Sequence, residues 1–320
     1  MKYLVVGGAG YIGSHMVKHL LQAGHDVVVA DIAPTGPGIE WVELDIANAQ
    51  ALDALFAECR FDAVFHFASH IQVGESVADP DKYYHNNVAA TLTLLEAMIR
   101  ARIKYLIFSS SAAVYGDPHY TPIDEAHPKA PINPYGRSKW MVEQILQDFD
   151  RAYGLKSVSL RYFNAAGADP DGQLGECHEP ETHLIPLILQ AASGRRQAIT
   201  VFGHDYDTPD GTCIRDYVHV ADLASAHELA VQYLLAGGDT TAFNLGNGQG
   251  FSVQAVIETA RAATGQRIEV IEAPRRDGDP ARLVADASRA RELLGWAPRF
   301  AGLETIVGHA WGWEQRYPWR

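Results

Sequence analysis

The chain has 320 residues, of which 47% are hydrophobic, and a formal net charge of −13 at pH 7. This length suffices for one large α/β unit or two domains, and the charge argues against nucleic acids and anionic membranes as partners. No apolar run of about 18 residues predicts a membrane span, and the three scattered cysteines, Cys59, Cys177 and Cys213, favour reduced thiols in the cytoplasm.

Short apolar runs alternate with helical patterns along the chain. The runs predict strands over residues 3–6, 26–30, 41–44, 63–67, 105–109 and 158–160. Such alternation is typical of an α/β fold, here a Rossmann-type doubly wound parallel sheet with helices on both faces. Ligands bind beyond the carboxyl ends of such strands, so the residues that follow each run are candidate site residues.

A glycine turn follows the first predicted strand. Its sequence, GGAGYIG over residues 7–13, lets a pyrophosphate approach backbone N–H groups at the positive end of a helix predicted over residues 12–21. Asp31 ends the second strand at the distance expected for an acid that binds the ribose. Its carboxylate would repel a 2′-phosphate, and no Lys or Arg occurs between Lys18 and Arg60. The turn therefore predicts NAD rather than NADP.

Two histidine pairs have the spacing of zinc ligands on a helix. His15/His19 and His66/His70 lack both the glutamate of a zinc-protease motif and a third ligand nearby. We expect them at the surface or behind the site, and we expect no metal. Farther along, the Gly-, Pro- and Asp-containing stretch 167–180 predicts a domain boundary or a mobile loop.

The fifth predicted strand ends in three serines, residues 109–111, beside the place where a nicotinamide would lie. Pro134 predicts the start of a helix that runs to about residue 150, and Tyr135 and Lys139 share one of its faces. A serine, a tyrosine and a lysine together could serve hydride transfer. A free phenol has a pKa near 10, and lowering it to about 7 requires about 4 kcal/mol, which Lys139 and a bound nicotinamide could supply.

Ten motifs along the chain, some of them described above, can be compared with known families. They are GGAGYIGSH, HFASHIQVGESV, YYHNNVAAT, FSSSAAVYGD, NPYGRSKWMVEQIL, LRYFNAAGA, FGHDYDTPDGTCIRDYVHV, FNLGNG, APRRDGDP and ADASRA. Through them nearly the whole chain resembles the extended short-chain dehydrogenase/reductase family, and within it the UDP-glucose 4-epimerases. RYFN followed by DGTCIRDYVHV is the part most particular to the 4-epimerases.

The resemblance implies site residues, position by position. The implied catalytic residues are Ser111, Tyr135 and Lys139. The implied NAD contacts are Gly7, Gly10, Tyr11, Ile12, Asp31, Asp45, Ile46, Phe67, Ala68, Asn86, Ser109, Tyr135, Lys139 and Phe163. The implied UDP-sugar contacts are Ser111, Tyr135, Asn164, His183, Leu184, Val201, Phe202, Arg215, Arg276 and Asp279. Three positions depart from the family. Ile71 replaces a lysine near the pyrophosphate, His183 replaces an asparagine, and Ala113 replaces a threonine that often assists at the sugar hydroxyl.

The resemblance also implies an activity. It is the interconversion of UDP-glucose and UDP-galactose through a transient 4-ketopyranose, with NAD tightly held. Leu283 stands where the family often has a tyrosine beside the N-acetyl pocket, so UDP-N-acetylhexosamines are a further hypothesis. A UDP-pentose or UDP-uronate 4-epimerase would share these residues and stays open. A 4,6-dehydratase is disfavoured because Ala112 and Ala113 replace its acids, and a non-catalytic NAD-binding protein is disfavoured because Tyr135 and Lys139 are present.

We expect two domains with the active site between them. Residues 1–168 would form the NAD-binding Rossmann domain, joined by a returning strand near 243–245. Residues 169–320 would form a smaller C-terminal α/β domain that binds the UDP-sugar. The resemblance further implies a homodimer that pairs helices expected at about 82–101 and 134–152.

Overall fold

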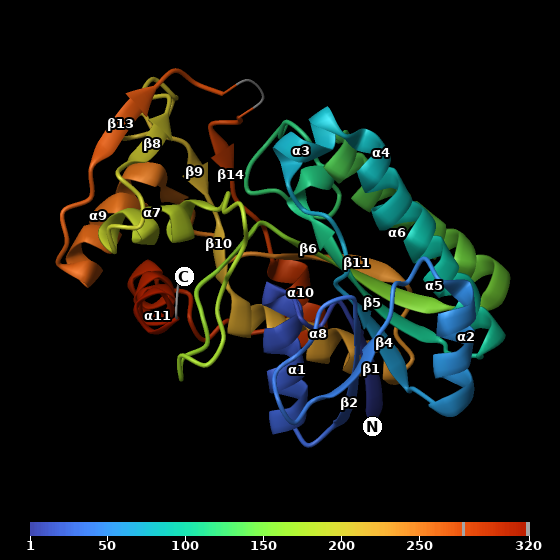
Figure 1. Ribbon diagram of the computed structural model, residues 1–320. Coiled ribbons are helices and arrows are strands. Elements are labelled where there is room, and N and C mark those ends of the chain that lie inside the picture. Colours follow the sequence, from blue (N-terminus) through green and yellow to red (C-terminus); the bar gives the residue numbers. More distant parts are fainter. Residues whose placement is uncertain (277–278, 318–320) are drawn as a thin grey trace.

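The computed structural model describes residues 1–276 and 279–317 (Figure 1). Residues 277–278, which fall within the APRRDGDP motif, and residues 318–320 lie outside the described part. The large sheet has seven parallel strands in the order β11-β6-β5-β4-β1-β2-β3. Its strands are β1 (Lys2–Val6), β2 (Asp26–Asp31), β3 (Glu40–Glu43), β4 (Ala63–His66), β5 (Tyr105–Ser111), β6 (Lys156–Tyr162) and β11 (Thr241–Leu245). The Rossmann-type fold and all six predicted strands are confirmed.

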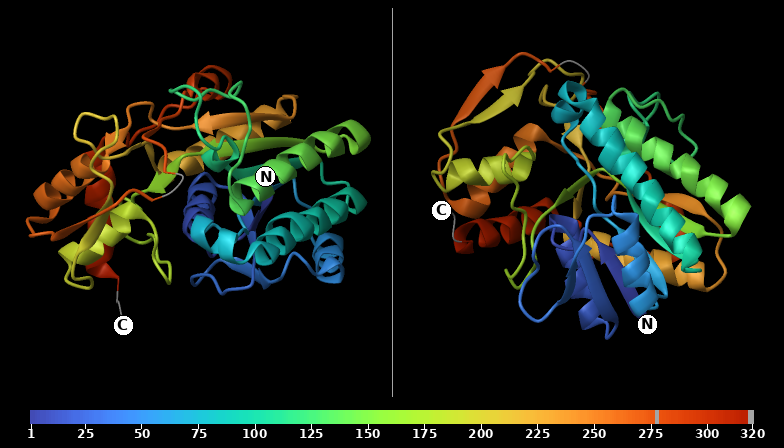
Figure 2. Two further views of the ribbon diagram at one scale, coloured as in Figure 1. Left: turned by 90° about the horizontal axis from the view of Figure 1, so that it is seen from above. Right: turned by 45° about the vertical axis from the view of Figure 1, so that its right-hand side comes forward.

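Helices cover both faces of this sheet because its strands are apolar on both sides (Figure 2). In β1, Tyr3 and Val5 pack on one face, and Leu4 and Val6 pack on the other. The first face carries α1 (Tyr11–Gln22), α8 (Val220–Leu235) and α10 (Ser288–Leu294), and the second carries α2 (Ala49–Glu58), α5 (Thr91–Arg100) and α6 (Pro134–Tyr153). Among the described residues, no helix has the length and apolar character needed to cross a bilayer.

The helix expected at 82–101 is built from three segments. They are α4 (Pro80–Tyr83), the π-helical η1 (Tyr84–Ala90) and α5, and the short α3 (Val73–Ala78) precedes them. A π-helical turn widens the helix by one residue and is often found at functional sites. The helix expected from residue 134 is α6. Asn133 caps its start by accepting from Gly136 N at 2.8 Å, and Gly154 ends it with a φ of 70°.

A second, smaller core lies beside the sheet. It is formed by α7 (Leu184–Ala192), α9 (Val253–Thr264) and α11 (Leu303–Arg316). Three small sheets complete this part: β8 (Ile199–Phe202) with β13 (Val270–Ala273), β7 (Asn164–Ala166) with β10 (Tyr217–His219), and β9 (Ile214–Arg215) between β12 (Phe251–Ser252) and β14 (Arg282–Leu283). The division at residue 168 stays a prediction. The elements α8, β11 and α10 follow residue 168 in the chain, yet they belong to the large sheet or pack on it.

Candidate active site

The glycine turn between β1 and α1 leaves the start of α1 open. A side chain at Gly7 would lie 2.5 Å from Ala68 N, and one at Gly13 would overlap the Gly7 carbonyl. At Gly10, by contrast, an added Cβ would meet only the Gly7 oxygen, at 3.5 Å, and no side chain caps the helix. The turn is thus tightly packed at Gly7 and Gly13 and open at Gly10. This opening fits a pyrophosphate bound at the N-terminus of α1.

Asp31 stands beside this opening at the end of β2. Its two carboxylate oxygens accept hydrogen bonds from Ala9 N at 2.9 Å and from Ala33 N at 3.0 Å. Each oxygen keeps a lone pair for a further donor, as the hydroxyls of a ribose require. Among the described residues no Lys or Arg forms an ion pair with Asp31. The residues therefore fit NAD better than a cofactor with a 2′-phosphate.

The three predicted catalytic residues come together at the carboxyl end of β5. Ser111 is the last residue of β5, and Tyr135 and Lys139 lie on the first turns of α6. The Lys139 ammonium is 5.9 Å from the centre of the Tyr135 ring, and it donates to Ser69 Oγ and to the Ser109 carbonyl, each at 2.8 Å. These contacts fix the lysine between the strand ends and the tyrosine.

Burial disfavours the charged forms of both Tyr135 and Lys139. It raises the pKa of the Tyr135 phenol, and hydrogen bonding to Ser111 opposes the rise. Burial also lowers the pKa of Lys139 to about 7, against the attraction of Glu143. Removing either charge from water is costly, so the chain by itself favours a neutral phenol. To act as a base near neutral pH, Tyr135 needs a lower pKa. The positive charge that lowers it must therefore arrive with a bound ligand.

A buried polar network lies behind the catalytic residues. Glu143, one helical turn beyond the lysine, accepts from Ser110 Oγ at 2.5 Å and from Arg161 Nε at 2.9 Å. Arg161 in turn donates to the Tyr115 hydroxyl at 2.9 Å, and that hydroxyl donates to Asn244 at 2.6 Å. The network links β5, α6, β6 and β11 and so holds the catalytic helix against the sheet. We did not predict it from the sequence.

The other predicted NAD contacts occupy two kinds of position. Around the opening, the backbone of Phe67 and Ala68 lies against Gly7, and the Tyr11 hydroxyl donates to the Gly167 carbonyl at 2.7 Å. The remaining ones pack or cap within the protein: Ile12 and Ile46 in the two large cores, Phe163 against the Ala112–Tyr115 cluster, Asn86 within η1 and Asp45 in its own turn. Their contacts with NAD stay predictions.

The predicted arginines meet at one carboxylate. Arg215 is 3.4 Å from one oxygen of Asp279, and Arg276 Nε donates to the other at 2.9 Å. The Arg276 guanidinium lies 4.7 Å from the centre of the Phe202 ring. Asp216 does not pair with Arg215, because its buried carboxylate accepts backbone N–H groups instead. Because two guanidinium groups face a single carboxylate, a net positive charge remains at this place. That charge could bind a diphosphate.

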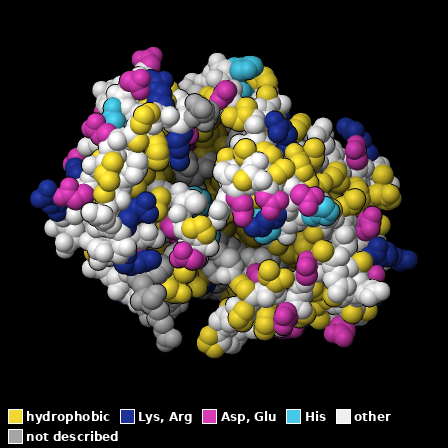
Figure 3. All heavy atoms as spheres, turned by 45° about the horizontal axis from the view of Figure 1, so that its top comes forward, with side chains coloured by type: hydrophobic (Ala, Val, Ile, Leu, Met, Phe, Trp, Pro, Cys, Tyr) yellow, Lys and Arg dark blue, Asp and Glu magenta, His cyan; other side chains and the backbone are white. Residues whose placement is uncertain are grey.

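Four other predicted substrate residues lie on neighbouring elements. Asn164, in β7, donates to the Asp216 carbonyl at 2.9 Å, and Leu184 begins α7. Val201 is only 2% exposed and packs in the smaller core, so its backbone alone can reach a ligand. His183 precedes α7, and its Nδ1 pairs with Glu176. Figure 3 shows the surface hollowed between the two halves of the molecule, with basic side chains on one wall.

Comparison with known proteins identifies the family. Residues 3–246 match the NAD dependent epimerase/dehydratase family. The chain belongs to this family. The UDP-glucose 4-epimerase of Streptococcus mutans is 52% identical over 326 residues, which cover 99% of this chain and 98% of that protein.

Solved structures agree. The UDP-glucose 4-epimerase from Brucella ovis in complex with NAD is 48% identical with a TM-score of 0.94, and the match covers 97% of each chain. The enzyme from Bifidobacterium longum in complex with NAD+ and UDP is 39% identical with a TM-score of 0.93, over 99% of each chain. The predicted family and the dependence on NAD are confirmed.

Two of the four histidines expected at the surface or behind the site are not at the surface. His15 and His66 are 4% and 0% exposed, and they lie inside the protein rather than at its surface. His15 hydrogen-bonds to the Tyr11 carbonyl at 2.8 Å, and His66 to Thr91 Oγ1 at 2.8 Å. Because burial disfavours the imidazolium, the pKa of both rings is lowered, that of His66 to about 3. Both are therefore neutral core side chains.

Proposed function

We propose that this chain is a UDP-glucose 4-epimerase, which interconverts UDP-glucose and UDP-galactose by oxidising and then reducing C4 of the sugar. The observation that carries the proposal is the set of buried Ser111, buried Lys139 and half-buried Tyr135 beside the open start of α1. Full-length similarity to proteins of that name supports it.

Tyr135 moves the proton in this reaction. It accepts the proton of the C4 hydroxyl and later returns it to the same oxygen, so the cycle consumes no protons. Ser111 donates a hydrogen bond to that oxygen in both directions and stabilises its developing charge. When bound, NAD supplies the acceptor and donor of the hydride at C4. Lys139, held by Ser69 and Ser109, binds the ribose and faces the tyrosine.

The buried pair also makes the base depend on its ligands. Since burial raises the pKa of Tyr135 and lowers that of Lys139, the phenol stays protonated until positive charge is present nearby. Proton removal is then restricted to the loaded site. The base is therefore active only in the protein that holds oxidised NAD.

The UDP group anchors the substrate while the sugar changes orientation. Arg215 and Arg276 would grip the diphosphate, and Asp279 aligns both guanidinium groups. The 4-ketose must stay bound and present its opposite face before it is reduced. Charged hydrogen bonds to the diphosphate retain it without contacting the sugar ring, so the ring remains free to turn.

The position of Leu283 favours a second group of substrates, the UDP-N-acetylhexosamines. Leu283 lies on β14 and packs against the cluster that contains Ala112 and Tyr115. Ala112 is the residue that follows Ser111 in the sequence. A leucine is smaller than the tyrosine that often occupies this place, and the difference leaves room for a 2-acetamido group.

The test of the proposed function uses purified protein and UDP-galactose without added NAD. Formation of UDP-glucose, measured by anion-exchange chromatography, would support both the reaction and a retained cofactor. No UDP-glucose with or without added NAD would refute the function. A parallel incubation with UDP-GlcNAc should give UDP-GalNAc, and its absence would limit the enzyme to unsubstituted sugars.

We further propose a homodimer in the cytoplasm. The helix α6 and the α4–η1–α5 segment cover one face of the large sheet (Figure 2), and Met141 on α6 is 40% exposed. The resemblance to the 4-epimerases implies a contact between two copies on these helices. Light scattering should give twice the 35.0 kDa of one chain. The three cysteines are free thiols, which suits a reducing compartment.

A further inference from the structure

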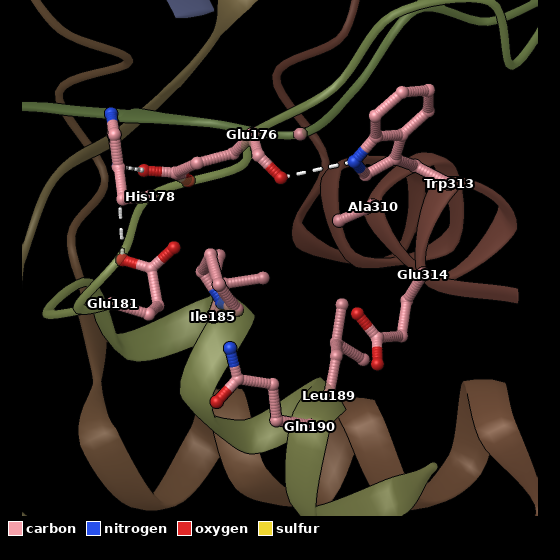
Figure 4. A pocket seen from close by; sticks show the side chains of 11 residues that line it. Glu176, His178, Glu181, Ile185, Leu189, Gln190, Ala310, Trp313 and Glu314 are labelled. Carbon is pink, nitrogen blue, oxygen red and sulfur yellow. Dashed lines mark hydrogen bonds and ion pairs between the residues drawn. The ribbon is translucent and has the colours of Figure 1, made fainter. Parts of the chain in front are cut away.

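Four side chains from the loop between β7 and α7 direct polar atoms at one another. Glu176, His178, Glu181 and His183 each offer one oxygen or nitrogen, and these four atoms lie within 4.8 Å of one another. His178 Nδ1 is 3.1 Å from Glu176 Oε1 and 3.9 Å from Glu181 Oε1. His183 Nδ1 contacts Glu176 Oε1 and is 3.9 Å from Glu181 Oε1. In Figure 4 both labelled carboxylates of the cluster point toward His178.

We propose that Glu176, His178, Glu181 and His183 bind a divalent transition-metal ion, of which zinc fits best. Two imidazole nitrogens and two carboxylate oxygens are a tetrahedral zinc donor set. Zinc lies about 2.0–2.2 Å from such ligands, so tetrahedral ligand atoms stand roughly 3.3–3.6 Å apart. The separations of 3.1 and 3.9 Å bracket this range. His183 Nδ1 and Glu176 Oε1 are in direct contact, so these two atoms must move apart to receive the ion. The two nitrogens disfavour Ca²⁺ and Mg²⁺, which prefer oxygen.

The sequence itself builds this arrangement. The pattern is E-x-H-x-x-E-x-H, and in an extended chain residues two apart point to the same side. Each half of the pattern therefore contributes one carboxylate and one imidazole to a common centre. The backbone N–H groups of Thr182 and His183 donate to Glu181 Oε1 at 2.7 and 2.8 Å. Such outer hydrogen bonds commonly orient the carboxylate ligands of metals.

Burial makes a cation at this centre favourable. The side chains of Glu176 and Glu181 are only 4% and 5% exposed. Within residues 1–276 and 279–317, neither carboxylate forms an ion pair with a Lys or Arg. Their ion-pair partners among the described residues are the rings of His178 and His183. One divalent ion, bound after these rings lose their protons, would neutralise both buried carboxylates. The Trp313 indole also donates to the Glu176 carbonyl at 3.0 Å and fixes the loop to α11 (Figure 4).

The position of the cluster gives the ion a positioning role. The His178 ring is 6.4 Å from the ring of Tyr11, whose hydroxyl is bonded to the Gly167 carbonyl at the start of the same loop. His183 immediately precedes α7. Coordination through Nδ1 would leave Nε2 of His183 as an N–H donor, suited to a phosphate oxygen. The ion would thus fix the loop against both the NAD side and the UDP-sugar side of the site.

The test measures zinc in the tag-free holoenzyme. After dialysis against a weak chelator and titration with zinc, mass spectrometry of the metal should find one zinc per chain. Glu181→Gln and His178→Ala should each weaken zinc binding at least tenfold. Glu179→Gln is the matched control, because it makes the same charge change in the same loop at an exposed position outside the cluster. It should bind zinc as the wild type does.

Two further readouts separate coordination from a merely structural loop. Co²⁺ in place of zinc should give the intense visible absorption of a tetrahedral site, and His178→Ala should abolish it. Zinc should raise the melting temperature of the wild type and of Glu179→Gln but not of Glu181→Gln, whose circular dichroism should match the wild type. No stoichiometric zinc, or equal affinity in Glu181→Gln, would overturn the proposal. None of these measurements uses turnover, so the result is independent of the proposed function.

Discussion

Replacing Tyr135 by Phe removes the proposed base and little else. Tyr135 is half-buried, and hydrogen bonding to Ser111 favours its ionised form. A positioned general base typically contributes 10²–10⁴-fold to a rate, so kcat for UDP-galactose should fall by at least about 100-fold. The loss of one hydroxyl should cost about 1 kcal/mol of stability, which lowers the melting temperature by about 1–2 °C in a chain of this length.

The assay compares this variant with Tyr153→Phe. Tyr153 ends the same helix and is 61% exposed, so its loss of a hydroxyl should change neither kcat nor stability. Turnover is followed by separating UDP-glucose from UDP-galactose, and bound NAD is measured after denaturation. We expect Tyr135→Phe to keep its NAD while turnover collapses. If it converts UDP-galactose within threefold of the wild-type rate, Tyr135 is not the base.

Three further predictions follow from the same contacts. Burial holds the pKa of Lys139 at about 7, below its unfolded value, so the folded NAD-free chain binds fewer protons than the unfolded chain above pH 7. The free energy of unfolding of this NAD-free chain, measured in urea, should therefore rise by about 1.4 kcal/mol per pH unit from pH 7 to 10. The gain should be lost again as the pH falls back to 7, and Lys139→Met should remove the slope. Arg215→Met should lower kcat/KM for UDP-galactose by about 10–100-fold, mainly through KM, whereas Arg275→Met should stay within twofold; equal effects would refute the diphosphate contact. Glu143→Gln should lower the free energy of unfolding by about 3–5 kcal/mol because it leaves Arg161 buried without its partner, and a loss below 1 kcal/mol by denaturant unfolding would contradict that role.

The parts of the fold that depend on neighbours in the sequence could be predicted. The glycine turn, the helix after it and Asp31 form within about 25 residues, and each has its own local signal. The same holds for α6, where Asn133 and Pro134 mark the start and Gly154 marks the end. Resemblance then placed the catalytic residues, and the structure brings Ser111, Tyr135 and Lys139 together from two elements.

Features that depend on distant contacts could not be predicted in this way. Tyr115 and Asn244 are 129 residues apart, and no local pattern announces that their side chains will meet. The π-helical turn over Tyr84–Ala90 has the same apolar spacing as an ordinary helix at the level of sequence. The stretch 167–180, which we expected to be a boundary or a mobile loop, carries half of the Glu/His cluster. Its E-x-H-x-x-E-x-H spacing was the signal that could have revealed that cluster.

The most direct test of the central claim follows the hydrogen on C4 of the sugar. UDP-galactose carrying deuterium at C4 is incubated with the purified protein in ordinary water, and the product UDP-glucose is examined by NMR and mass spectrometry. We predict that the deuterium is retained at C4, because the hydrogen that leaves as hydride returns to the same carbon. Loss of deuterium from C4 to water, with conversion still proceeding, would contradict the proposed reaction.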